Sequence, residues 1–345
     1  MAGRRGSVSA AQQKSGHRAK RDGADLPKRS ADENHDRNSG ERDRSPRAIR
    51  CQAVRHAPDR LRDHGNEIVV GLTLLHALES AQGRPRGASW RAPIGRMLDR
   101  VLLSANPDGM LYDEIRPSDL QPLQTRLSDN WGYVYGAVYT HYMVTGETRY
   151  RDAVRRVLTN LPKYRGHDWE NGSQDGYADA IESALYLVAR EPVPEALDWI
   201  ESETKTLIGF QQPDGTIERW YGDGNWSRTL LLYAMWKTQG CYLDGWEEGV
   251  QLGAVRDGPL LLVSLVAPAR WKGRLHFDYA RHKRTLNFDR DYVRLNEWPE
   301  WFTVDESRLY RVTSGAGSET IRLGSELKDG LEVAGTGRWT IQPAR

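Results

Sequence analysis

The sequence predicts a mainly helical fold of stacked helical hairpins, followed by a C-terminal β-sandwich. Two observations predict the helical part. From about residue 65 apolar residues recur at helical spacing, and Gly or Pro separates the successive segments. A third observation predicts the β part, because after Trp246 apolar and polar residues alternate between Gly and Pro breaks. We therefore divide the chain into a tail, 1–62, a helical domain, 63–247, and a β-sandwich domain, 248–345.

The tail is predicted to be disordered. Residues 1–62 carry 16 Lys and Arg against 8 Asp and Glu, and the first aromatic residue of the chain is Trp90. Such a segment cannot bury enough apolar surface to fold alone. A basic arm for nucleic acid is the alternative. We favour a disordered tail, which could also reflect a misplaced start, and expect no nucleic-acid partner.

Metal, membrane and export signals are weak in this sequence. The two cysteines, Cys51 and Cys241, form no ligand cluster, so we expect no disulfide framework, metal or cofactor. No apolar run approaches the ~20 residues of a membrane span, so we expect no membrane partner. The basic start lacks an apolar h-region, which indicates a cytoplasmic protein as written. A start further upstream would leave a periplasmic or secreted location open.

The predicted helices alternate between two kinds. Those near 129–145, 174–190 and 225–239 are apolar over most of their surface, which predicts inner helices buried on both sides. Those near 147–162 and 194–211 have a charged face and are predicted to lie outside. The full set is 66–81, 91–104, 129–145, 147–162, 174–190, 194–211 and 225–239. Short connections between inner and outer helices indicate stacked hairpins.

The inner helices begin with similar residues. The starts read HGNEI at 64–68, SDNWG at 128–132, SQDGY at 173–177 and DGNWS at 223–227. If each inner helix follows an outer one, all inner helices run the same way and their N-termini gather on one rim. That places together Asn66, Glu67, Asp129, Asn130, Trp131, Asp175, Asp223, Asn225 and Trp226. Acids and amides at helix starts also serve as caps, and this alternative stays open.

The helix at 174–190 carries an unusual acidic stripe. At ~100° per residue, Asp175, Asp179, Glu182 and Tyr186 fall on one side of the helix, beside its packing face. Residues 172–189 contain no Lys or Arg. A solvated acidic face is one interpretation. We favour carboxylates that face a shared cavity and shift each other's pKa values, as glycoside hydrolysis requires. The predicted catalytic residues are Asp175, Asp179, Glu182 and Asp129.

Aromatic and amide side chains near this rim favour a sugar ligand, because flat rings cover the apolar faces of sugars and amides bond their hydroxyls. For each Trp, core packing is the alternative, and His167 is either a general base or a loop histidine. The predicted substrate-binding residues are Asn130, Trp131, Tyr133, His167, Trp169, Trp220, Tyr221, Asp223, Asn225 and Trp226.

Two segments carry a family resemblance. GSQDGYADAIESALYLVAR, 172–190, resembles the inner-helix motif of unsaturated glucuronyl hydrolases and related six-hairpin toroid enzymes, and 217–240 is similar to a later inner helix. The resemblance implies an (α/α) toroid in which an Asp is the general acid/base on an unsaturated uronic acid. Asp175 or Asp129 would be its nearest counterpart. Six hairpins need twelve helices, whereas the sequence predicts seven, so we expect an incomplete toroid or a natural protein longer upstream.

The C-terminal part adds an analogy. Heparinase-type polysaccharide lyases are similar in joining a helical toroid to β-sheet domains. We expect the aromatic segment 296–310 to pack on the helical domain.

The sequence therefore predicts a glycoside hydrolase with carboxylate acid/base chemistry, acting on an oligo- or polysaccharide that could contain uronic acid. A polysaccharide lyase with His167 or Tyr177 as base is one alternative. A non-catalytic glycan-binding or inactive homologue is another. The sugar, the linkage and the oligomeric state stay open.

Overall fold

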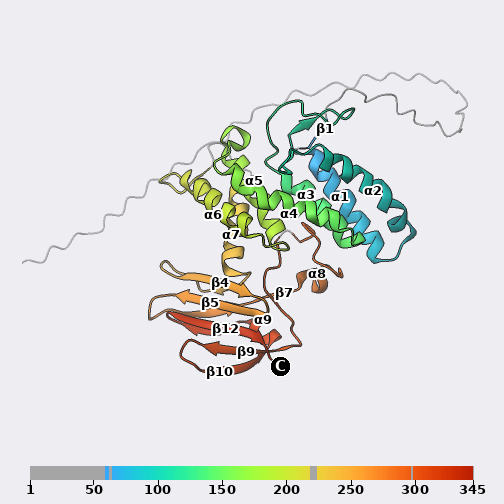
Figure 1. The fold of residues 1–345 in the computed structure, drawn as a ribbon. Helices are drawn as coiled ribbons and strands as arrows, with labels where there is room; N and C mark the ends of the chain where they lie inside the picture. Colours follow the sequence, from blue (N-terminus) through green and yellow to red (C-terminus); the bar gives the residue numbers. More distant parts are fainter. Residues whose placement is uncertain (1–58, 62–63, 218–223, 297, 345) are drawn as a thin grey trace, which may run out of the picture. The chain divides into compact units, whose positions relative to one another are not determined.

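The computed structural model describes residues 59–61, 64–217, 224–296 and 298–344. Helices fill the first part of this range and strands the second (Figure 1). The helices are α1 (His64–Ala81), α2 (Pro85–Leu103), α3 (Trp131–Thr145), α4 (Thr148–Asn160), α5 (Gln174–Val188), α6 (Pro194–Gly209) and α7 (Asn225–Thr238). Each predicted helix is confirmed, with ends that shift by a few residues.

The helices form two layers. In the inner layer α1 packs on α3, α3 on α5 and α5 on α7, while α2, α4 and α6 pack outside them. Two contacts in each neighbouring pair of inner helices advance along both helices in the same direction, which shows that these helices are parallel. The pairs are Asn66–Asn130 and His76–His141 for α1 and α3, Gly132–Ser183 and Tyr139–Glu191 for α3 and α5, and Asp175–Asn225 and Ala178–Thr229 for α5 and α7. The inner helices therefore bring their N-termini to one side.

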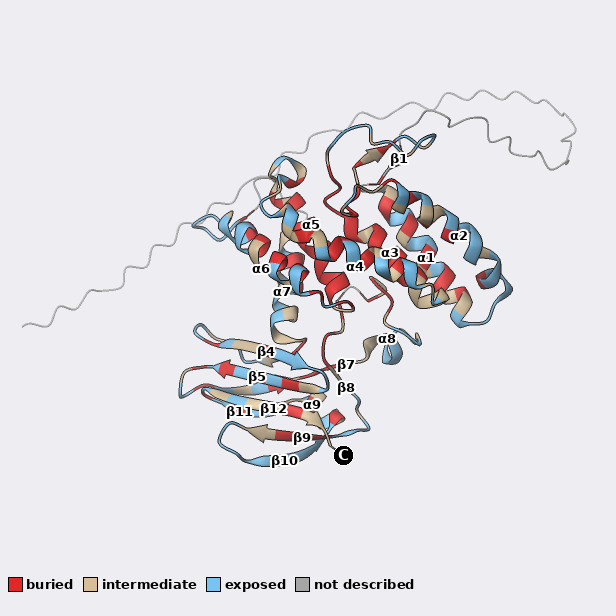
Figure 2. Cartoon of the chain, in the orientation of Figure 1, coloured by how far each residue is buried: buried red, intermediate tan, exposed pale blue. Residues whose placement is uncertain are grey.

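The contact between α3 and α5 depends on the absence of a side chain at Gly132. A Cβ at this position would lie 2.4 Å from the Cβ of Ser183. The Gly132 backbone N–H donates to Ser183 Oγ at 3.0 Å. This close approach positions the start of α3 against the middle of α5, and both helices are largely buried (Figure 2).

The two helices at the ends of the inner layer, α1 and α7, are less buried than an inner position predicts. The exposed fraction of Leu231 on α7 is 50%, and α1 exposes Ile68, Leu72 and Leu75. The prediction that 225–239 is buried on both sides is therefore wrong. Among the described residues, α1 and α7 each contact an inner helix on one side only, so part of their apolar surface stays uncovered.

The strands follow the helices and form two antiparallel sheets that share one hydrophobic core. The five-stranded sheet has the order β10-β9-β12-β5-β4, and the three-stranded sheet has the order β11-β6-β3. Their bounds are β3 (Tyr242–Asp244), β4 (Gln251–Asp257), β5 (Leu260–Val266), β6 (Lys272–His276), β9 (Leu309–Ser314), β10 (Glu319–Leu323), β11 (Leu331–Ala334) and β12 (Gly337–Pro343). The short helix α9 (Gly324–Asp329) joins β10 to β11, and its Leu327 belongs to the same core.

The domain limits differ from the predicted ones at both ends of the helical part. Strand β1 (Asp59–Arg60) pairs with β2 (Glu114–Ile115) inside the stretch predicted as a tail. The next residue, Leu61, is buried in the helical core. At the other end β3 and the buried Cys241 already belong to the β part, so its first residues precede 248.

A segment of the C-terminal part returns to the helices. It comprises 285–302, between helix α8 (Arg281–Arg284) and strand β8 (Thr303–Val304), which pairs with β7 (Asp278–Tyr279). Its Val293 and Trp301 are buried in the helical core, and Trp298 packs against that core. The expectation that 296–310 packs on the helical domain is therefore confirmed for Trp298 and Trp301, whereas Phe302 and Tyr310 belong to the core between the two sheets.

Within the described ranges, no helix combines the length and the apolar character needed to cross a bilayer.

We predict that Gly132→Ala destabilises the protein by about 1–3 kcal/mol, because the new methyl group overpacks the α3–α5 contact. Gly71→Ala is the matched control. Gly71 lies inside α1, and a Cβ there meets nothing within 4 Å. The control should stabilise by about 0.5–1 kcal/mol through helix propensity. Urea unfolding measures both values, and equal effects of the two changes would disprove the close contact.

Candidate functional site

The starts of α5 and α7 meet through one amide. Asn225 Nδ2, at the first residue of α7, donates to Asp175 Oδ1 and to Asp179 Oδ1, each at 2.7 Å. Ser173 caps α5 by accepting from the Gly176 backbone N–H at 2.9 Å. Because one amide group bonds both carboxyl groups, Asp175 and Asp179 are close neighbours. The predicted gathering of acids at the inner helix starts is confirmed for these residues.

Asp179 is placed to keep its proton. Only 13% of its side chain is exposed. Burial raises the pKa of Asp179 well above the ordinary value, and the negative charges of Asp129, Glu182 and Asp175 raise it further. The hydrogen bond from Asn225 opposes this shift. A carboxyl group in such surroundings stays protonated at a pH where ordinary carboxyl groups are ionised.

Glu182 lies one turn further along α5 and is fully buried. Its Oε1 accepts from Arg294 Nη1 at 2.7 Å, and its Oε2 forms an ion pair with Arg228 on α7. Arg228 Nη2 also donates to Asn225 Oδ1 at 2.6 Å. A buried carboxylate is tolerable when a charged hydrogen bond and an ion pair of this kind neutralise it. The acidic stripe has no Lys or Arg of its own, and its balancing positive charges come from Arg228 on α7 and Arg294 in the 285–302 segment.

Arg294 reaches the site from the C-terminal part of the chain. Its guanidinium carbon lies 3.7 Å from the ring centroid of Tyr133 and 4.5 Å from that of Tyr186. The residue adopts a left-handed backbone conformation with φ 61°, which is uncommon for a residue other than glycine. Such conformations persist where the surrounding structure holds them, and they cluster at functional sites.

The backbone on the N-terminal side of Arg294 is held at several points. Arg190 Nη2 donates to Asp291 Oδ2 at 2.6 Å and to the Tyr292 carbonyl at 3.2 Å. Val293 packs so close to Gly136 on α3 that a Cβ on Gly136 would lie 2.9 Å from it. These contacts fix the position from which the Arg294 side chain enters the cluster.

Three further predicted residues lie at or beside this cluster. Asp129 is buried, accepts from the Asn130 backbone N–H at 2.9 Å, and is close enough to raise the pKa of Asp179. Asn130 Oδ1 accepts from Ser128 Oγ at 3.0 Å and from Asn66 Nδ2. Tyr133 is partly buried, and burial together with the charge of Glu182 raises its pKa to about 12. The Tyr133 phenol therefore keeps its proton near neutral pH.

The predicted sugar-stacking role fails for two tryptophans. Trp131 and Trp169 have exposed fractions of 0%. Their rings belong to the helical core, where Trp169 packs edge-on against Trp199 at 6.3 Å. A ring buried on both faces cannot cover a sugar, so core packing is the correct interpretation for both. Trp226 is partly buried and also packs against this core.

None of the described ring contacts of His167 involves Asp129, Asp175, Asp179 or Glu182. Its ring meets Trp169 at 4.6 Å and Tyr164 at 6.1 Å, and burial lowers its pKa. The loop-histidine interpretation agrees with these contacts better than the general-base interpretation. The predicted residues Trp220, Tyr221 and Asp223 lie outside the described residues.

Sequence reasoning missed both arginines. Arg228 carried a weak local signal, since it stands three residues after Asn225, one turn along the same predicted helix. Arg294 carried none, because it is 112 residues away from Glu182 in the sequence. In the part of the chain that the structure describes, no group of three or more His, Cys, Asp or Glu side chains is arranged to hold a metal ion.

Neither the known protein-family models nor the curated protein sequences include a match to this chain. The case for a function therefore depends on the geometry of the cluster itself.

We predict that Arg294→Met destabilises the protein by about 1.5–3 kcal/mol, the contribution of one hydrogen bond to a buried charge. Glu182 keeps its ion pair with Arg228, so the fold should survive. Arg308→Met removes an exposed arginine of the C-terminal part and should change the free energy of unfolding by less than about 0.5 kcal/mol. Adding Glu182→Gln should remove most of the Arg294 effect. If the stability losses of Arg294→Met and Glu182→Gln add in the double variant, Arg294 and Glu182 are not energetically coupled.

We predict that Asp179→Asn becomes more stable relative to wild type as pH rises. The folded-state pKa of Asp179 is raised above its unfolded value near 3.8. The wild type therefore has its full stability contribution below that unfolded value and loses it as pH rises through the folded pKa. The loss is about 1.4 kcal/mol for each pH unit that separates the folded pKa from the unfolded one. The Asn variant has no proton to lose.

Urea unfolding between pH 4 and 9 checks this pH dependence. Asp152→Asn on exposed α4 is the control and should follow the wild-type pH profile. A constant difference in stability between Asp179→Asn and wild type across this pH range would contradict a raised Asp179 pKa.

Proposed function

We propose that this chain is a glycoside hydrolase in which Asp179 acts as the general acid on an oligo- or polysaccharide. One observation carries the proposal. Asp179 is surrounded by Asp129, Asp175 and Glu182, and burial together with these charges raises its pKa. Glycoside hydrolysis needs one carboxyl group that still holds a proton beside another that is ionised. A cluster in which the environments of neighbouring carboxyl groups differ supports that division of roles.

The second carboxylate in this proposal is Asp129 or Asp175. Asp175 shares the Asn225 amide with Asp179, and Asp129 is close enough to shift the Asp179 pKa. Glu182 is not a candidate for this role, because two arginines hold it fully buried. In the proposal Glu182 positions Arg228 and Arg294 and sets the charge around Asp179.

Polar groups beside the acids suit a ligand rich in hydroxyl groups. Tyr133 keeps a phenolic proton to donate, and Arg228 is about one-third exposed. Amides and hydroxyls that donate and accept hydrogen bonds give orientation and specificity in sites for polar ligands.

The helical arrangement agrees with the family resemblance. We propose that the parallel inner helices and their outer partners are a section of an (α/α) toroid of the six-hairpin glycosidase type. The alternation of inner and outer helices and the acids at the inner helix starts support this. Fold alone does not imply function, so the resemblance is secondary to the acid cluster.

The lyase alternative has less support. Its proposed bases were His167 and Tyr177. Tyr177 has an exposed fraction of 6% and packs against Phe210 at 5.5 Å, while His167 packs against Trp169. The assay described below distinguishes a non-catalytic glycan-binding protein from an enzyme.

We predict that the chain releases reducing ends from an oligosaccharide, without a new ultraviolet-absorbing double bond, and that Asp179→Asn lowers kcat/KM by about 10²–10⁴. The wild-type rate should fall as pH rises through the raised Asp179 pKa, since only the protonated acid can donate. The assay uses a panel of neutral and uronic-acid-containing oligosaccharides.

The exposed acid Asp198 on α6 provides the control, and Asp198→Asn should keep full activity. Circular dichroism confirms that each variant is folded. Ultraviolet-absorbing products would favour a lyase. Binding without turnover would favour a glycan-binding protein, and full activity of Asp179→Asn would exclude Asp179 as the acid.

A further inference from the structure

Within the described residues, the five-stranded sheet has one buried face and one outward face with several exposed apolar side chains. In β5, Leu261, Val263 and Leu265 are buried in the core shared by the two sheets, while Leu262 and Val266 between and after them are exposed. Successive residues of a strand point to opposite faces, so Leu262 and Val266 mark the outward face.

Strand pairing assigns the other strands to the same two faces, because directly paired residues share a face. Val255 and Thr340 pair with Leu262, Thr313 pairs with Thr340, and in β10 Ile321 and Leu323 pair with Arg311 and Leu309. Large apolar residues on the outward face with exposed fractions of 40% or more are Val255, Leu262, Val266, Leu309, Ile321 and Leu323. Thr340, Thr313 and Arg311 separate the apolar residues of β4 and β5 from those at the other edge of the sheet, so the apolar surface forms two patches. Exposed apolar patches rimmed by polar residues mark interaction sites.

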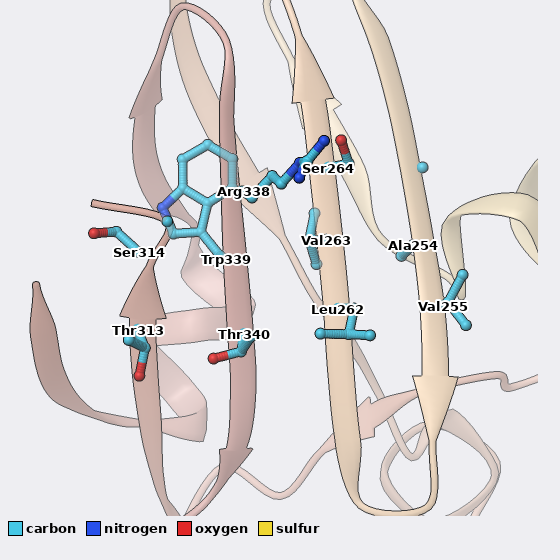
Figure 3. A pocket seen from close by; sticks show the side chains of 12 residues that line it. Ala254, Val255, Leu262, Val263, Ser264, Thr313, Ser314, Arg338, Trp339 and Thr340 are labelled. Carbon is cyan, nitrogen blue, oxygen red and sulfur yellow. The ribbon is translucent and has the colours of Figure 1, made fainter. Parts of the chain in front are cut away.

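A groove crosses this face. Its volume is 630 Å³, and its side chains lie on β4, β5, β12 and β9 (Figure 3). Ala254 and Val263 are buried, whereas Val255 and Leu262 beside them are exposed, so the groove opens outward. Gly253 and Gly315 lie along its walls. When two sheets pack face to face, the side chains of one lie between those of the other, with the sheets ~10 Å apart. The groove leaves room for side chains of a second sheet to pack in this way.

The types and charges of the side chains on this face favour one kind of binding partner. The apolar side chains are aliphatic, which suits another aliphatic surface better than a sugar. Among the described residues of this face, Arg311 and Glu319 on β9 and β10 neutralise each other in an ion pair of 3.2 Å near one edge of the sheet. Arg338 lines the groove, and Asp257 ends β4, so these two also carry opposite charges and two copies can meet without net repulsion.

The size of the face also fits a second copy. Five strands about 4.8 Å apart, with about 3.3 Å per residue over strands of up to 7 residues, give a footprint of about 450 Å². Two copies would bury about 900 Å², which lies in the range of weak and transient interfaces. Two-fold contacts between identical patches are the commonest form of homo-oligomer.

We propose that this outward face is a contact surface between two copies of the chain, which form a reversible two-fold dimer. The dimer uses the five-stranded sheet and leaves the acid cluster free, so it is independent of the proposed enzymatic function. The modest area predicts a dimer that dissociates on dilution.

Sedimentation equilibrium of the full chain over a concentration series tests the proposal. Wild type should show a one-chain and two-chain equilibrium. Leu262→Glu places a charge at the centre of the face and should raise the dimer Kd at least about thirtyfold, as expected for a residue at an interface centre. Leu103→Glu is the matched control, because Leu103 is 74% exposed on α2 and should leave the Kd unchanged.

Circular dichroism and thermal melting establish that each variant is folded. If Leu262→Glu does not fold, Thr340→Arg on the same face replaces it. Three results would overturn the proposal. These are a one-chain mass for wild type at every soluble concentration, equal Kd values for Leu262→Glu and Leu103→Glu, or open-ended association beyond two chains.

Discussion

The candidate site depends on the neutralisation of one buried carboxylate. Glu182 has no exposed surface, and leaving such a charge unpaired would cost several kcal/mol. Arg228 and Arg294 satisfy it from two directions. Because α7 supplies one arginine and the 285–302 segment the other, the charge requirement ties α5, α7 and the C-terminal part together. Next to it, burial and the charges of Asp129 and Glu182 raise the pKa of Asp179.

Local patterns predicted the helices well because helical periodicity and Gly or Pro breaks are properties of a single segment. The direction of the inner helices also followed from sequence, because a chain that returns through an outer helix each time begins every inner helix on the same side. The burial of α1 and α7 did not follow. It depends on whether a further helix lies beside each, which no local pattern records.

The site was predicted in part for the same reason. Asp175 and Asn225 occupy equivalent places at helix starts, so a repeat in the sequence located them, and helical periodicity placed Asp179 on the same side of its helix as Asp175. Trp131 and Trp169 occupy similar places, but their large apolar area favoured burial over a role at the rim. Arg294 could not be foreseen, because its contact with Glu182 depends on the path of a segment that first passes through the β part.

That path has a consequence for how the protein is made. A ribosome releases α5 and α7 long before residue 294, so Glu182 emerges with one of its two arginines still unsynthesised. Contacts between such distant residues form late, because loop closure must precede them. The contact between Glu182 and Arg294 therefore forms only after the C-terminal region has been made and folds back. Assembly of the acid cluster is thus coupled to a region that lies more than a hundred residues further along the chain.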